Sequence, residues 1–142
     1  MRMNIPATFD NINTSLNDSE VKYLYKLLFY LSDIERSGES KGFDVRNKQL
    51  NQFLKSECIK LDYKNTPIKH YDKNSIIFKK GDSVCLSLLK HIRNAFAHGR
   101  LIKIKNQYEI VDIYKEKMTA YGLFSSSVLF NLVDKIIECR KS

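Results

Sequence analysis

Apolar residues recur at the spacing of one helix face near the start of the chain. They occupy every third or fourth position, at Val21, Leu24, Leu28 and Leu31. Polar residues at 17–19 (Asn17, Asp18 and Ser19) supply an N-cap in front of this pattern. The spacing therefore predicts a helix from about residue 18 to about residue 36, ended by the stretch from Gly38 to Gly42.

A second segment repeats the helical spacing, with apolar positions at Leu50, Phe53, Leu54, Cys58 and Leu61. Asp44 is a suitable N-cap, so we expect a helix that starts there and ends near Tyr63. Between Tyr63 and Lys80 the periodicity weakens and Pro67 appears. This part of the chain is predicted to be an irregular connection.

A third helix is expected from a cap at Asp82 or Ser83 to His98, with Gly99 in the left-handed conformation that ends many helices. One arc of this helix is apolar and predicted to face the core: Val84, Cys85, Leu88, Leu89, Ile92, Ala95 and Phe96. The opposite arc is predominantly polar: Ser87, Lys90, His91, Arg93, Asn94, Ala97 and His98.

Two short strands, 101–105 and 108–113, are expected as a hairpin around Asn106 and Gln107. A serine at 125–127 then opens a fourth helix with a wide apolar stripe from Val128 to Ile137. The pattern thus predicts one domain over residues 1–142, built mainly of α-helices.

The chain is basic, with 24 Lys and Arg against 16 Asp and Glu and a net charge of +8. This balance favours an anionic partner, nucleic acid first and an anionic membrane surface second. Seven lysines and three acidic residues lie between Lys55 and Lys80. Interleaved aromatic residues, Tyr63, His70, Tyr71 and Phe78, allow this segment to hold a phosphate backbone and stack a base. The alternative is a solvated loop whose aromatic residues enter the core.

Cys58, Cys85 and Cys139 are widely spaced and fall in segments predicted to be helical, so we expect reduced, buried thiols. No C-x-x-C pair occurs, and His70, His91 and His98 do not complete a zinc-finger spacing. We therefore expect no metal site. The N-terminus has no apolar signal-like region and no apolar run reaches the length of a membrane span, which predicts a cytoplasmic protein.

Arg93 and His98 together place a permanently charged guanidinium and an imidazole at the end of the third helix. The imidazole can move protons while the guanidinium neutralises charge on a phosphate, which is enough to cleave RNA without a metal. Their Cβ atoms diverge by about 140° around the helix axis. Two copies of the helix side by side, with the narrow Ala97 between them, bring both groups to one cleft, which suggests a homodimer. The alternative is that Arg93 forms a surface ion pair and His98 only faces the last helix carbonyls.

The run from Leu89 to Gly99 closely resembles the signature of the HEPN superfamily, in which Arg, a polar residue, three further residues and His end a central helix. The order of elements also resembles that of small stand-alone HEPN proteins. The resemblance implies a HEPN-like bundle of four to five helices with a short β-hairpin after the motif helix. It also implies a homodimer formed through that helix, and a metal-independent endoribonuclease site that needs no cofactor.

By the same resemblance, His98 acts as general acid or base, Arg93 holds the scissile phosphate, and Asn94 orients one of them. The products are then a 2′,3′-cyclic phosphate and a 5′-hydroxyl. Lys90, His91 and Arg100 are candidate substrate-binding residues.

Many members of the superfamily are toxins or effectors of abortive infection and antiviral defence. One subgroup has, two residues after the motif His, a Tyr that a partner enzyme modifies. This chain has Arg100 there, which argues against that arrangement and leaves an inhibitory partner protein open. The alternative function is a non-catalytic module that binds RNA or a nucleotide, or a dimeric interaction protein.

Overall fold

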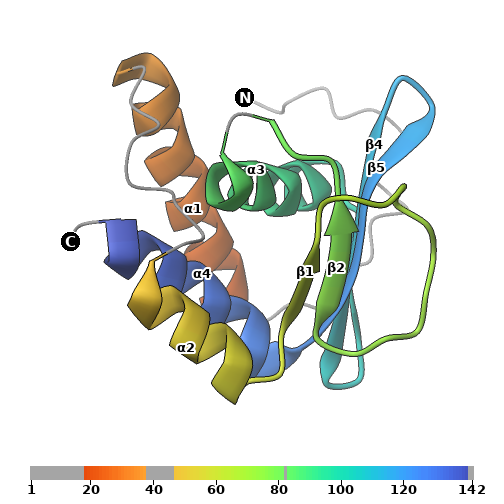
Figure 1. The fold of residues 1–142 in the computed structure, drawn as a ribbon. Coiled ribbons are helices and arrows are strands. Elements are labelled where there is room, and N and C mark those ends of the chain that lie inside the picture. The colour runs from red at the N-terminus through yellow and green to blue at the C-terminus, as the bar shows by residue number, and fades with distance from the viewer. Residues whose placement is uncertain (1–17, 38–46, 82, 141–142) are drawn as a thin grey trace, which may run out of the picture.

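A computed structural model describes residues 18–37, 47–81 and 83–140. Within these ranges the chain forms four helices and five strands: α1 (Asp18–Ser37), α2 (Lys48–Ser56), β1 (Lys60–Asp62), β2 (Ser75–Phe78), α3 (Val84–Ala97), β3 (Leu101–Ile104), β4 (Gln107–Tyr114), β5 (Lys117–Ser125) and α4 (Ser126–Arg140). The strands form one mixed sheet in the order β1-β2-β5-β4-β3, with the helices on one side of it (Figure 1). The prediction of a mainly α, HEPN-like helical bundle is therefore wrong, and the fold is α/β.

The strand that sequence periodicity missed most completely is β5, at the centre of the sheet. It pairs antiparallel with β2 on one side and β4 on the other. Residues 119–124 are all buried, so the strand has no solvated face and no polar alternation to reveal it. Gly122 allows β2 to approach, because a Cβ there would lie 2.9 Å from the Cβ of Ile76.

The other unexpected strands, β1 and β2, follow from an early end to the second helix. Helix α2 stops at Ser56, and Cys58 adopts a left-handed φ of 54°, which turns the chain into β1. Leu61 then pairs with Ile76 in a parallel register. The Cys58 thiol is exposed, contrary to the expectation of a buried helical cysteine, whereas Cys85 and Cys139 are buried. The predicted cap, Asp44, lies outside the described residues, and Asn47 caps α2 instead.

Helices α1, α3 and α4 and the β3–β4 hairpin confirm the sequence-based predictions. Ser83 caps α3 by accepting a hydrogen bond from the Leu86 amide, while the alternative cap, Asp82, lies outside the described residues. Gly99 ends the helix with a φ of 68°. The apolar arc of α3 faces the core as expected, with Leu88, Leu89 and Ile92 fully buried.

The helices form two levels above the sheet. Helices α3 and α4 contact the strands directly, while α1 packs on α3 and α2 packs on α4. Helix α3 lies against β4 and β3, so the residues on its sheet-facing side meet side chains from β4. No helix within the described ranges is both long enough and apolar enough to cross a bilayer.

Candidate active site at the end of helix α3

Part of the polar arc of α3 faces the sheet and meets a carboxylate. Inward-facing residues of β4 alternate with outward-facing ones, so Tyr108, Ile110 and Asp112 are buried on the helix side. The Asp112 side chain is only 7% exposed. A carboxylate at this depth needs donors, and α3 supplies them.

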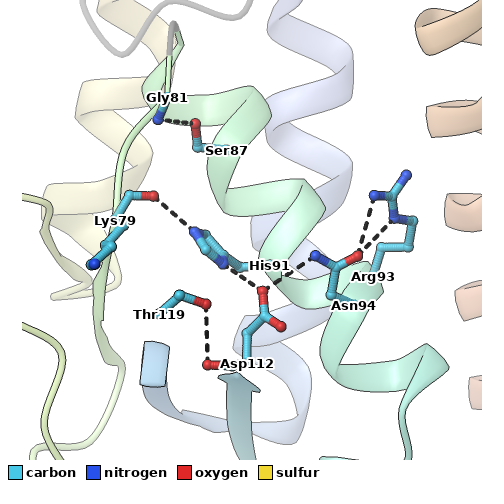
Figure 2. Close-up of polar contacts among 8 residues, drawn as sticks. All are labelled: Lys79, Gly81, Ser87, His91, Arg93, Asn94, Asp112 and Thr119. Carbon is cyan, nitrogen blue, oxygen red and sulfur yellow. Dashed lines mark hydrogen bonds and ion pairs between the residues drawn. The ribbon is translucent and has the colours of Figure 1, made fainter. Parts of the chain in front are cut away.

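Asp112 anchors a chain of hydrogen bonds that includes Asn94 and Arg93 (Figure 2). Its Oδ2 accepts hydrogen bonds from His91 Nδ1 at 2.7 Å and from Asn94 Nδ2 at 3.3 Å. The Asn94 Oδ1 accepts in turn from Nε and Nη2 of Arg93, both at 3.2 Å. Asn94 donates to Asp112 through its amide nitrogen and accepts from Arg93 through its oxygen. Asp112 therefore fixes the Asn94 side chain, and Asn94 in turn orients the Arg93 guanidinium.

His91 is held at both ring nitrogens. Nδ1 faces Asp112, and Nε2 lies 2.8 Å from the backbone carbonyl oxygen of Lys79. Both partners are hydrogen-bond acceptors, so each ring nitrogen that carries a hydrogen donates it to its partner. The His91 side chain is 13% exposed and its ring lies edge-on to Phe78. His91 is therefore a structural clamp between β2, β4 and α3.

Asp112 remains ionised near neutral pH. Burial acts to raise the pKa of its carboxyl, but the hydrogen bonds from His91 and Asn94 and the positive charge of His91 outweigh it and hold the pKa below the ordinary value. The backbone carbonyl of Asp112 also accepts a hydrogen bond from the Thr119 hydroxyl at 3.1 Å. Asp112 thus acts as a fixed negative charge that positions its neighbours.

His98 is separate from this network. It is the exposed C-cap residue of α3, and its backbone amide bonds to the Asn94 carbonyl. Its imidazole makes no hydrogen bond, ion pair or ring contact with any described residue. One chain therefore brings Arg93, Asn94 and His91 together but leaves His98 at the open end of the helix.

Two further candidates lie on α3 or directly after it. Lys90 is partly exposed on the helix itself, and Arg100 is partly exposed at the turn into β3. The Arg100 amide donates to the Ala95 carbonyl at 2.7 Å, so the turn is closed by backbone bonds. In the described part of the chain, no three His, Cys, Asp or Glu side chains gather into a group that would ligate a metal.

Asp112 is the site residue that sequence reasoning missed. The sequence did contain an indication of it. Asp112 is a carboxylate two positions after Ile110, so in a strand with alternating burial it lies on the same buried face as Ile110. Such a position requires a buried partner, but the sequence does not show which helix crosses the strand.

Comparison of the chain with protein-family models, with curated proteins and with solved structures gave no match. The resemblance to a nuclease family therefore depends on the motif residues of α3, namely Arg93, Asn94 and His98.

Proposed function

We propose that this chain is a metal-independent endoribonuclease that acts as a homodimer, with Arg93 and His98 as its catalytic residues. One observation carries the proposal: the Asp112–Asn94 relay fixes the Arg93 guanidinium, while the same helix ends in an exposed imidazole without a partner among the described residues. A phosphate-binding group held in place, on the same helix as an imidazole open to substrate, suits cleavage of a phosphodiester once a second subunit brings the two groups together.

In this proposal the ribose 2′-oxygen attacks the adjacent phosphorus and the 5′-oxygen leaves. The His98 imidazoles of the two subunits move the protons, one taking the 2′-hydroxyl proton and the other protonating the leaving oxygen. Arg93 stabilises the additional negative charge on the phosphate through its forked N–H donors. The products are a 2′,3′-cyclic phosphate and a 5′-hydroxyl, so the bond changes balance without a metal or cofactor.

An apolar surface beside the site supports dimerisation. Tyr25 and Phe29 on α1 are 52% and 71% exposed. The Tyr25 ring packs edge-on against the Phe96 ring of α3, with the two ring centroids 5.8 Å apart. Ala97 is exposed on the same helix as Phe96. Large aromatic groups that a single chain leaves in water are typical of an interface.

Helix geometry indicates how a dimer would bring Arg93 of one subunit near His98 of the other. Arg93 and His98 are about 7.5 Å apart along the axis of α3, at 1.5 Å per residue. A two-fold axis at the level midway between residues 95 and 96, on the side of the exposed Ala97, would bring antiparallel copies of α3 together and set the partner's His98 level with Arg93 along the helix axis. The basic charge of +8 favours RNA as the substrate. Cleavage of cellular RNA makes the chain a candidate toxin or antiviral-defence effector.

The test is cleavage of a labelled single-stranded RNA in the presence of a chelator, with mass analysis of the products. We expect cyclic phosphate ends from the wild-type chain and no products from His98→Ala or Arg93→Ala. Lys115→Ala, at the exposed β4–β5 turn, is the matched charge control and keeps full activity. Cleavage that survives either active-site substitution refutes the mechanism. Salt-sensitive RNA binding without any product would instead identify a non-catalytic RNA-binding module.

A further inference from the structure

A second candidate binding site lies at the end of β2, outside the Arg93 network. It is a hollow of about 400 Å³ lined by the start of the β1–β2 connection and the residues that follow β2, among them Tyr63, Lys64, Pro67, Phe78, Lys79 and Lys80. This volume is within the range of pockets that hold small ligands or single nucleotides.

The charge of this pocket is positive and uncompensated within the described residues. Lys64, Lys79 and Lys80 are exposed, and none of their ammonium groups forms an ion pair there. The neighbouring carboxylate, Asp62, accepts hydrogen bonds from the backbone amides of Lys64 and Asn65 and from the Asn65 side chain. Asp62 therefore shapes the turn that presents Lys64, and does not neutralise the three lysines by direct pairing.

The pocket also contains an aromatic platform. The Tyr63 ring is partly buried against Phe78, with ring centroids 6.1 Å apart, and the Lys80 ammonium lies 5.9 Å from the Tyr63 centroid. The ammonium lies over the ring face, so a base stacks on Tyr63 only by displacing it, and the displaced ammonium can then meet the phosphate of the same nucleotide.

The pocket is connected to the catalytic helix through Lys79. Its backbone carbonyl accepts the hydrogen bond from His91, while its ammonium group lies at the far end of the side chain, away from His91 (Figure 2). His98 lies about 10 Å further along the helix axis than His91, the residue that contacts Lys79.

We propose that this pocket binds one nucleotide of the single-stranded RNA substrate, with the base against Tyr63 and the phosphate between Lys64, Lys79 and Lys80. The identification of the ligand as substrate rests on the proposed nuclease function, whereas the binding itself does not. Of the aromatic and basic residues between 63 and 80, the pocket is lined by two rings, Tyr63 and Phe78, and by three lysines, whereas Lys69, His70, Tyr71 and Lys73 lie outside it.

The test measures binding separately from cleavage. The probe is a short fluorescent single strand of 2′-O-methyl RNA, which has no free 2′-hydroxyl to attack the phosphate, and anisotropy is recorded at several salt concentrations. We expect Lys64→Ala/Lys80→Ala to reduce the slope of log affinity against log salt by about 0.7, the value for the one phosphate that the pocket no longer neutralises. The matched control, Lys69→Ala/Lys73→Ala, removes the same charge from exposed positions of the same segment outside the pocket and leaves the slope unchanged.

Tyr63→Leu keeps an apolar side chain against Phe78 and removes the stacking ring. We expect it to weaken binding of the probe about fivefold or more. Equal slopes for the two lysine double variants, or full affinity in Tyr63→Leu, would overturn the pocket. Loss of slope only in the pocket variant, with unmodified RNA left intact, supports the pocket and refutes the nuclease. Cleavage of unmodified RNA by the wild-type chain, with equal salt slopes for the two lysine double variants, supports the nuclease and refutes the pocket.

Discussion

The His91–Asp112 pair allows the sharpest quantitative test of the site. Asp112→Asn preserves the shape of the side chain and removes its charge, so it removes the charge-assisted part of the hydrogen bonds to His91 and Asn94. The two paired side chains are 13% and 7% exposed, so solvent screens their interaction only weakly.

The expected cost follows from this geometry. A hydrogen bond to a charged group contributes about 1.5–3 kcal/mol, and removing one partner of a fully buried pair costs about 3–5 kcal/mol. The amide of the Asp112→Asn variant still offers an oxygen to His91, so we expect the free energy of unfolding to fall by about 2 kcal/mol. With a denaturant slope of about 2 kcal/mol per molar urea, the unfolding midpoint moves down by about 1 M.

The sign of the pH dependence is also fixed. The pKa of Asp112 is lower in the folded chain than in the unfolded one, so its carboxylate contributes stability above the unfolded value of about 3.9. That contribution is lost as the pH falls through the folded pKa. The gap between the wild-type chain and Asp112→Asn is therefore complete at neutral pH and closes in acid.

Urea unfolding followed by circular dichroism at neutral and acidic pH measures both effects. Asp72→Asn is the control, because Asp72 is exposed and its side chain makes no hydrogen bond or ion pair with the described residues. An Asp112→Asn variant as stable as wild type at neutral pH refutes the charge-pair argument. So does a deficit that persists unchanged in acid. Under the proposed function this variant also loses kcat more than it changes KM, because Asp112 positions Arg93 without touching RNA.

Three further outcomes follow from single positions. Gly122→Ala places a Cβ 2.9 Å from Ile76 and should lower the free energy of unfolding by about 1–3 kcal/mol in a thermal or urea melt; unchanged stability contradicts the close approach of β2. Phe29→Glu puts a charge into the exposed aromatic surface and should convert a dimer into a monomer in sedimentation, whereas a persistent dimer argues for another interface. One thiol, Cys58, should react with a disulfide reagent in the native chain, and Cys58→Ser should abolish this reaction; fast reaction of the two buried cysteines contradicts the fold.

The sequence predicted those elements that expose one face to water and bury the other. Helices α1, α3 and α4 and the β3–β4 hairpin have such faces, and their apolar spacing is visible in the sequence. Strand β5 is covered on both sides, so its run from Thr119 to Phe124 has no alternation. Leu61 continues the helical spacing of α2, yet the left-handed Cys58 breaks the helix before it. Because of these two errors, the sequence-based prediction lacked most strands of the sheet and assigned the wrong fold class.

The site was predictable only where its residues are close in the sequence. Arg93 and Asn94 are adjacent and His98 ends the same helix, so one segment shows all three. Asp112 contacts His91 and Asn94, and the Lys79 carbonyl contacts His91, only because β4 and the end of β2 lie against α3 in space. No local sequence pattern indicates that these distant segments are in contact.

The turn from His98 to Arg100 has an evolutionary consequence. Backbone bonds from the amides of residues 98, 99 and 100 hold it, and Gly99 supplies the left-handed conformation, so the imidazole adds little to folding. Under the proposed function, a single codon change at His98 would silence the chain, and reversion would restore it, without passage through an unstable protein. Active and inactive descendants of such a nuclease would then share one architecture and differ at this exposed side chain.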